Sequence, residues 1–321
     1  MNRRLFLQMA GAGGAMLAGF RAVAGAAYPA KPVTVVVAFP PGGGTDTLAR
    51  TLSVSLAQAL GQPVVVENKP GASTVIGADY VAKSQPDGYT LLVTSAPHVS
   101  NPSLMKKLPF DTVKDFAPVC LAAKSPFVLV VKPDSPIKTL EDLMRQARER
   151  QLTFGSSGNG TNDHLSTELL SIIYGISMIH VPYKGTGPAL IDLMGGHIDL
   201  MFANIVGAAP LVRAGKLRAI AVTTAQRSTL MPELPAVQEI IGKPFDVSAW
   251  TGILAPAGTD PDIIQRLNKD VRASLEVQAV KDVMTSNGAD IVGGTPGEFQ
   301  DFIVSEIDKW GVIIKAAGIQ V

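Results

Sequence analysis

Two glycine-rich segments hold the residues whose types and spacing best suit binding chemistry. The first glycine loop, residues 39–46, reads Phe-Pro-Pro-Gly-Gly-Gly-Thr-Asp, and the second glycine loop, residues 155–162, reads Gly-Ser-Ser-Gly-Asn-Gly-Thr-Asn. Each follows an apolar run and precedes apolar residues at helical spacing, so each is expected to present backbone N–H groups and hydroxyls at a helix N-terminus. The helix dipole favours an anion there. Both loops together favour a cleft for a carboxylate; for one loop alone, a tight turn with Thr45 or Thr161 as an ordinary helix cap is the alternative.

The candidate ligand-binding residues come from these loops and from three other segments that follow apolar runs. Neither glycine loop contains Lys or Arg, and neither matches a P-loop or a dinucleotide-binding motif, so neutral donors and water are expected to bind the solute. The acids in the first helical turns, Asp46 and Asp163, are expected to stabilise their helices rather than act as general bases. Asn204 suits either hydrogen bonding to a ligand or helix capping. The predicted set is Phe39, Pro41, Gly42, Gly43, Thr45, Asp46, Ser95, Ser156, Gly158, Asn159, Gly160, Thr161, Tyr183 and Asn204.

Catalysis and metal binding find less support. A Ser–His–Asp hydrolase could draw on Ser156, Ser157 and His164, but no G-x-S-x-G motif is present, and His164 has apolar neighbours on a predicted helix. The single cysteine, Cys120, excludes an internal disulfide and a cysteine-rich metal site, and the four histidines are scattered. We expect no enzyme activity, no metal and no cofactor.

Short strands and helices alternate around these loops, which predicts an α/β fold. A β-branched run precedes the first glycine loop and a helical pattern follows it to Gly61; the same order recurs around the second glycine loop, ending at Gly175. Two longer apolar runs, residues 116–131 and 245–254, are predicted to cross between two lobes. The prediction is a two-lobed protein with mostly parallel sheets and a hinge, in which residues 27–122 and 250–321 form lobe 1 and residues 123–249 form lobe 2.

Residues 1–26 are predicted to be an export signal. Arg3 and Arg4 precede an apolar run at residues 9–20, and residues 22–26 offer two A-x-A cleavage frames. The arginine pair fits a twin-arginine signal, and the general secretory route stays open. Without this segment the chain carries 25 basic and 27 acidic groups, which argues against nucleic-acid binding. The expected location is the periplasm.

Six motifs occur in order between about residue 28 and the C-terminus: residues 35–46, Glu67-Asn68-Lys69-Pro70-Gly71-Ala72, Ile76-Gly77-Ala78, Pro86-Asp87-Gly88-Tyr89-Thr90-Leu91, Val181-Pro182-Tyr183-Lys184-Gly185 and Ala255-Pro256-Ala257-Gly258-Thr259. Together they resemble the solute-binding receptors of tripartite tricarboxylate transporters, also called Bug-type receptors. The resemblance implies a type II periplasmic binding protein that closes two lobes on a small carboxylated solute and delivers it to a membrane permease. It also implies that the two glycine loops bind the carboxylate, through Pro41, Gly42, Gly43, Thr45 and Asp46 and through Ser156, Gly158, Asn159, Gly160 and Thr161. One departure is Ser73-Thr74, where the family commonly has Gly-Gly.

Three alternatives share parts of this pattern. A partner that presents a solute to a signalling sensor would use the same cleft, and a secreted hydrolase would use its serines. An effector-binding lobe pair of a transcription regulator is disfavoured by the export signal and by the absence of a helix-turn-helix pattern. A dicarboxylate, a tricarboxylate, an aromatic acid or an amino acid all suit the predicted cleft. We expect a monomer.

Overall fold

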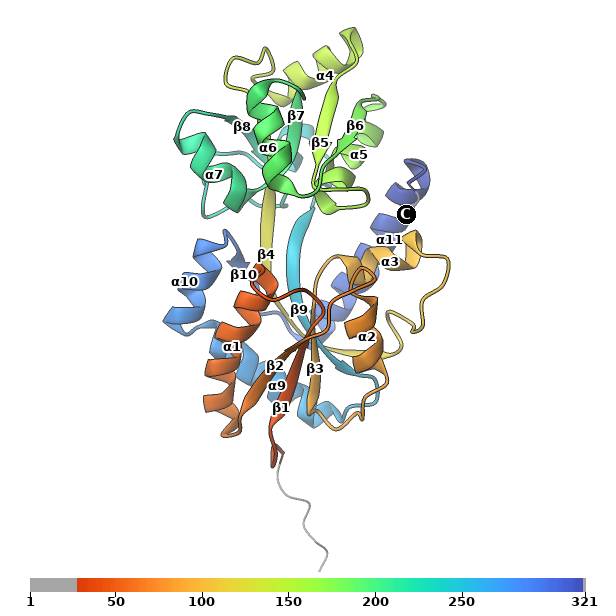
Figure 1. Ribbon diagram of the computed structural model, residues 1–321, viewed down its shortest axis with the longest axis vertical. Coiled ribbons are helices and arrows are strands. Elements are labelled where there is room, and N and C mark those ends of the chain that lie inside the picture. The colour runs from red at the N-terminus through yellow and green to blue at the C-terminus, as the bar shows by residue number, and fades with distance from the viewer. Residues whose placement is uncertain (1–27, 320–321) are drawn as a thin grey trace, which may run out of the picture.

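The computed structural model describes residues 28–319, so the predicted export signal, residues 1–26, lies outside the described residues. Figure 1 shows two groups of elements, one above the other, joined by two long strands. The lower group holds the first and last parts of the chain, and the upper group holds the middle part. The predicted α/β class is confirmed.

The lower group is built on a sheet with three parallel strands at one side. Strand β1 (Val33–Val37) pairs in parallel with β2 (Val64–Asn68) and β3 (Thr90–Thr94). Helices α1 (Gly44–Leu60), α2 (Val75–Ala82) and α3 (Pro97–Leu104) follow these strands. The same group contains α9 (Pro261–Leu275), α10 (Gln278–Ser286), β10 (Asp290–Ile291) and α11 (Pro296–Ala316). Because β1 and β3 are neighbours, the loops at their carboxyl ends meet at one edge of the sheet.

The upper group repeats this plan with strand β5 (Thr153–Ser156) in the central position. It pairs in parallel with β6 (Ile179–Pro182) and β7 (Leu200–Asn204). The remaining elements of this group are α4 (Leu140–Glu149), α5 (Asn162–Tyr174), α6 (Thr186–Gly195), α7 (Ile205–Arg213), β8 (Arg218–Val222) and α8 (Val237–Ile241). The carboxyl ends of β5 and β7 point toward the lower group, so loops of both groups face each other (Figure 1).

Two strands, β4 (Phe116–Val131) and β9 (Ser248–Pro256), cross between the groups. β4 pairs antiparallel with β9 from Phe116 to Pro126 and then with β7 from Phe127 to Val131. β9 also pairs antiparallel with β3, and β8 with β4. The sheets are therefore mixed rather than mostly parallel, because the crossing strands run against their neighbours. The predicted lobe limits at 122/123 and 249/250 fall within β4 and β9 and stay a prediction.

Local residue patterns begin two of the C-terminal helices. Asp260 caps α9 and is followed by Pro261, and Thr295 with Glu298 forms a capping box at the start of α11. α11 packs against α3 and β4, and it also contacts α5 of the upper group. Between residues 28 and 319, no helix combines the length and the apolar character needed to cross a bilayer.

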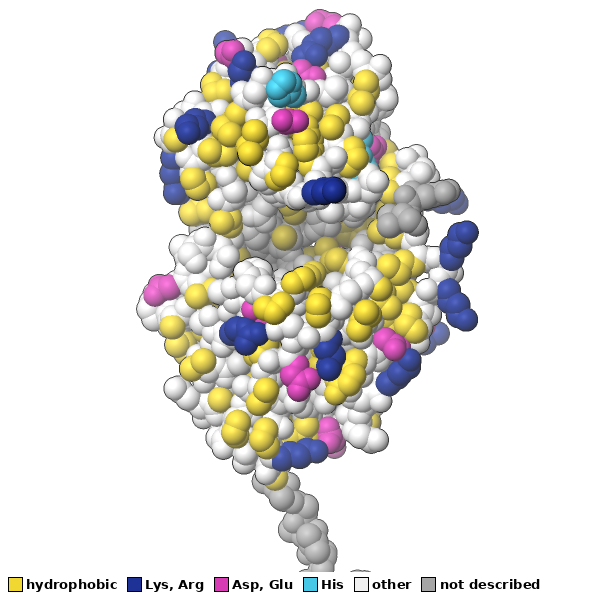
Figure 2. Space-filling view, in the orientation of Figure 1, with side chains coloured by type: hydrophobic (Ala, Val, Ile, Leu, Met, Phe, Trp, Pro, Cys, Tyr) yellow, Lys and Arg dark blue, Asp and Glu magenta, His cyan; other side chains and the backbone are white. Residues whose placement is uncertain are grey.

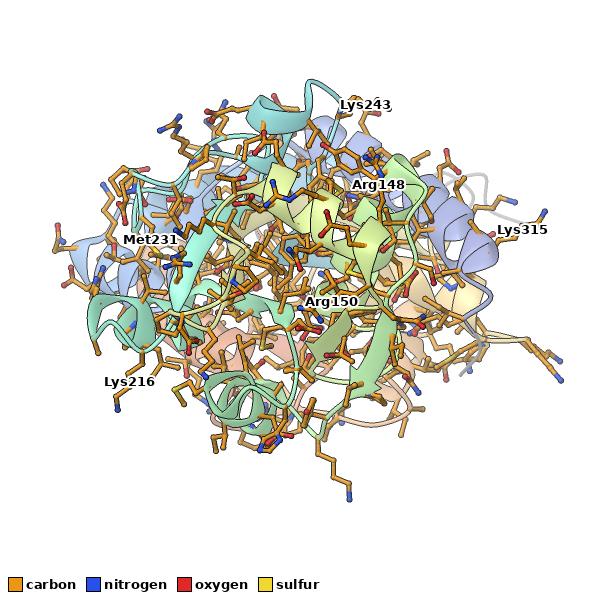
Figure 3. All side chains as sticks on the ribbon, turned by 90° about the horizontal axis from the view of Figure 1, so that it is seen from above. Arg148, Arg150, Lys216, Met231, Lys243 and Lys315 are labelled. Carbon is orange, nitrogen blue, oxygen red and sulfur yellow. The ribbon has the colours of Figure 1, made fainter. Side chains whose placement is uncertain are left out.

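Charged side chains lie mainly at the outer surface. Seen from above the upper group (Figure 3), Lys216, Lys243 and Lys315 point outward from the edge of the molecule, and all three are exposed. Arg150 pairs with Asp199 across 2.7 Å. Among the described residues that border the space between the groups, Lys124 and Asp163 are charged and the others are uncharged.

Candidate functional site

A cleft separates the two groups of elements, and Figure 2 shows it as a hollow across this face. One cavity of about 300 Å³ is bordered by Gly44, Thr45 and Ser95 from below and by Asn204 from above. A second cavity, of about 270 Å³, lies between Ser73 and Asn101 of the lower group and residues of the second glycine loop. Both cavities therefore use residues from both sides of the cleft.

The first glycine loop is held in shape by the carboxylate of Asp46. This carboxylate accepts hydrogen bonds from the backbone N–H of Gly42 at 2.9 Å, from Nε of Arg50 at 3.0 Å and from Nδ2 of Asn68 at 2.7 Å. The hydrogen bond from Arg50 is the main cause that lowers the pKa of Asp46 to about 2. Only 3% of Asp46 is exposed. Asp46 therefore shapes the loop from inside, which differs from the predicted contact with a ligand.

The loop leaves the N-terminus of α1 free of side-chain caps. Gly43 is the N-cap residue and, within the described residues, no side chain caps the helix, so Thr45 is not the cap that one alternative expected. Residues 41–44 are exposed, and Thr45 is half-buried at the first cavity. Unpaired N–H groups in the first turn of a helix attract an anion. Of the predicted residues, Thr45, Ser95 and Asn204 line this cavity, whereas Phe39, Pro41, Gly42 and Gly43 lie on the loop beside it.

The second glycine loop repeats this arrangement in the upper group. The carboxylate of Asp163 accepts hydrogen bonds from the backbone N–H of Ser157 at 2.6 Å and from its hydroxyl at 2.9 Å. Thr161 is the N-cap residue of α5, yet its hydroxyl donates to the carbonyl of Gly158 at 2.6 Å and does not cap the helix. The predicted residues Asn159, Gly160 and Thr161 line the second cavity, whereas Gly158 does not border it. Each lobe thus presents a glycine loop that an aspartate of the following helix supports.

Ser156 lies inside the protein, contrary to the prediction that it binds the ligand. None of its surface is exposed, and its hydroxyl lies 2.6 Å from Nε2 of His180. The reason is that Ser156 ends β5, directly beside β6, which carries His180. Nδ1 of His164 accepts a hydrogen bond from the N–H of Gly160 at 3.0 Å and does not contact either serine hydroxyl in the way a hydrolase requires. Burial is the main cause that lowers the pKa of His180 to about 4.

Tyr183 and Asn204 both have structural partners. The hydroxyl of Tyr183 donates to Asp192 at 2.7 Å, and the predicted contact of Tyr183 with a ligand stays a prediction. Burial, and then Asp192, raise the pKa of Tyr183 to about 12. Oδ1 of Asn204 accepts from the N–H of Val206 at 3.0 Å and caps α7, while the residue also borders the first cavity. Both interpretations of Asn204 therefore hold in part. Within residues 28–319, no three His, Cys, Asp or Glu side chains gather as a metal site.

Two residues of the second cavity, Ser73 and Asn101, were not in the predicted set. Ala72, Ser73 and Thr74 have φ angles of 45°, 52° and 76°, a left-handed conformation that is strained for residues other than glycine. Nδ2 of Asn101 donates to the carbonyl of Ser73 at 2.8 Å and so ties this turn to α3. The departure from Gly-Gly at residues 73–74 was the available signal for Ser73. No signal in the sequence pointed to Asn101, since it lies within a helix.

A model of the tripartite tricarboxylate transporter family receptor matches residues 48–319. The chain belongs to this receptor family. The receptor is similar to Protein BugT of Bordetella pertussis, with 40% identity over 295 residues that cover 91% of this chain and 90% of BugT. The predicted family and its solute-binding character are thereby confirmed; it is a family of periplasmic receptors rather than of enzymes.

Two solved structures show the same architecture as the receptor. A TctC solute-binding protein from Polaromonas without ligand has a TM-score of 0.84 at 26% identity, and covers 90% of this chain and 99% of its own. Rpa4515 of R. palustris, solved with adipate, has a TM-score of 0.75 at 36% identity, and covers 92% of this chain and 100% of its own. These similarities confirm the predicted two-lobed periplasmic binding protein fold.

Proposed function

We propose that the receptor captures a small carboxylate solute in the cleft between its lobes and passes it to the permease subunits of a tripartite membrane transporter. The observation that carries this proposal is the pair of glycine loops at the cleft. Each ends at a helix N-terminus without a side-chain cap, and each is supported by an internal aspartate, Asp46 or Asp163. Donors that are fixed before the ligand arrives lose little entropy on binding.

The neutral donors of both loops suit a solute that must be released again. Arg50, which follows the first loop, is already paired with Asp46 at 3.0 Å, and Lys124 of β4, which also borders the first cavity, lies 3.4 Å from Asp246. A carboxylate bound by N–H groups, hydroxyls and water avoids the desolvation cost of a buried ion pair. The adipate of Rpa4515, a dicarboxylate, supports the same class of solute for this receptor.

Closure of the lobes about β4 and β9 would bury the solute. Two crossing strands suit a hinge, because small changes of φ and ψ near their midpoints rotate one lobe against the other.

Export, lobe limits and oligomeric state complete the proposal. Residues 1–26 would direct the chain to the periplasm, residues 27–122 and 250–321 would move as lobe 1, and residues 123–249 as lobe 2. The receptor would act as a monomer. Capture of permease subunits by the loaded receptor, measured with membranes that contain them, would distinguish delivery to a transporter from presentation to a signalling sensor.

Thermal unfolding with a panel of acids and amides tests the solute class. The receptor is unfolded and refolded once to remove carried ligand, and is then heated with succinate, malate, adipate, citrate and benzoate and with the matched amides. A ligand at about one hundred times its dissociation constant adds roughly 2.7 kcal/mol of stability, a shift on the order of 4 °C for a chain of this size. We expect a shift with an acid and none with its amide. Equal shifts for acid and amide would contradict the proposed role of the loops.

A further inference from the structure

The second glycine loop is supported at two points by a pair of stacked histidines. His164 of α5 and His180 of β6 lie with ring centroids 3.7 Å apart and planes 9° apart. His164 accepts the N–H of Gly160, and His180 contacts the hydroxyl of Ser156, which also bonds to the backbone of Gly158. One aromatic stack therefore contacts both ends of the loop that borders the second cavity.

The hydrogen bond from Gly160 fixes the protonation state of His164. A backbone N–H can only donate, so Nδ1 of His164 must carry a lone pair, and the proton of the neutral ring must be on Nε2. Nε2 lies 3.7 Å from Oε1 of Glu168, one turn further along α5. A second proton on the ring would turn Nδ1 into a donor directed at another donor, and the contact with Gly160 would be lost.

Among the groups around the stack, His164 is the ring that bonds directly to the backbone of the second glycine loop. Phe154 of β5 stacks on His180 with centroids 4.8 Å apart and carries no charge. On α5, Glu168 and Asp163 are the ionisable neighbours, and Asp163 is bonded to Ser157. α11 also packs on α5, but its buried Glu306 is paired with Lys309, which also donates to the carbonyl of Asp246. His180 stays neutral above about pH 5, because burial lowers its pKa to about 4.

We propose that His164 is a positioning residue of the second glycine loop: Nδ1 of its ring accepts the N–H of Gly160 and holds this residue in place at the second cavity. The importance of this contact for solute binding rests on the proposed function, but the contact itself does not. The first glycine loop uses a different acceptor at the same spacing, because the N–H of Gly42 donates to the carboxylate of Asp46, whose pKa of about 2 keeps it ionised.

Amide hydrogen exchange of the ligand-free protein tests this proposal without any solute. Protection factors are measured by NMR for Gly160 and for Gly42 at pH 8. Loss of the acceptor on residue 164 should lower the protection of Gly160 roughly tenfold, the equivalent of one hydrogen bond. The protection of Gly42 should stay unchanged.

Three variants separate positioning from a merely structural role. In His164→Asn, Oδ1 takes the place of Nδ1 as the acceptor, so protection of Gly160 should stay close to that of the unsubstituted protein. In His164→Phe the stack is kept and the acceptor is lost, so protection of Gly160 should fall. His197→Asn changes an exposed histidine and should behave like the unsubstituted protein.

Two results would overturn the proposal. Unchanged protection of Gly160 in His164→Phe at pH 8 would show that Nδ1 does not hold the loop. An equal fall in His164→Asn and in His164→Phe would show that the packing of the imidazole, and not an acceptor at this position, protects Gly160. If His164→Phe does not fold, the imidazole ¹⁵N shifts decide instead, since a proton on Nδ1 of His164 at pH 8 contradicts the contact. Failure of the acid panel would leave all these outcomes unaffected.

Discussion

Substitution of Gly43 can separate the charge of the first glycine loop from its shape. Gly43 is the N-cap residue of α1 with φ −77° and ψ 167°, an extended conformation open to any residue. A Cβ atom there would meet only the carbonyl oxygen of Pro40, at 3.9 Å. Asp and Asn are both preferred N-cap residues, so Gly43→Asp and Gly43→Asn should each change the free energy of unfolding by only a few tenths of a kcal/mol.

The two variants should differ strongly in solute binding. A carboxylate on residue 43 would lie about 5 Å from an anion bound at the same helix N-terminus. At this distance two unit negative charges repel each other by about 1 to 3 kcal/mol, for dielectric constants between about 80 and 20. Its oxygens also compete for the N–H groups of the first turn, which α1 leaves without a side-chain cap among the described residues. Gly43→Asp should therefore bind the acid roughly 5-fold to 150-fold more weakly than Gly43→Asn.

Isothermal titration calorimetry with the acid found in the panel measures this difference. The gap between the two variants should narrow as salt rises from about 0.01 M to 1 M, because screening reduces a charge effect and not a steric one. Equal weakening in both variants would refute the electrostatic reasoning. Unchanged binding in both would show that the N-terminus of α1 does not bind the carboxylate.

Three further substitutions test how the fold supports the cleft. Asp46→Asn should lower the free energy of unfolding, measured in urea at pH 7, by about 1 to 2 kcal/mol, because the pKa of Asp46 falls from 3.8 to about 2 on folding. This stabilisation is present above pH 3.8 and is lost as the pH falls through 2. A difference between the two proteins that persists unchanged at pH 2 would contradict this account. Asp134→Asn is the control, since 72% of that side chain is exposed and its ion pair should contribute little. Ser73→Gly should raise the free energy of unfolding by roughly 0.5 to 1 kcal/mol, because glycine adopts a φ of 52° without strain. Ser305→Gly, in the middle of α11, should lower it by a similar amount. Loss of stability in Ser73→Gly would mean that the side chain contributes more than the strain costs. Gly252→Ala should lower the melting temperature through a cost of about 1 to 3 kcal/mol, because the new Cβ would clash with the ring of the buried Phe299. Gly297→Ala meets no atom within 4 Å and should not lower it; equal melting temperatures for these two variants would refute the packing argument.

The helices and strands near the loops could be predicted because their signals are local. Gly61 and Gly175 end α1 and α5 in left-handed conformations, and Thr295 with Glu298 begins α11, as the sequence indicates. The strand directions could not be predicted in the same way. β9 pairs with β3 and β4, which lie far away along the chain, and the choice of a partner at such a distance has no signature in the local residue pattern.

The candidate site was predictable at the level of loops rather than of side chains. Both glycine loops border the cleft as expected, since a strand followed by glycines and a helix places the loop at the carboxyl edge of a sheet. Which hydroxyl turns inward depends on neighbours from other elements. His180 draws Ser156 into the core from 24 residues away, and Asp192 engages Tyr183. Such contacts require the tertiary structure.

The position of β9 also has a consequence for folding during synthesis. β3 and β4 are both complete by residue 131, but the strand that lies between them begins only at Ser248. Until that part of the chain has left the ribosome, the lower sheet has a gap with two unpaired edges, and contacts of such long sequence separation form slowly. A chain truncated at residue 247 should therefore not fold, even though it contains every residue of both glycine loops.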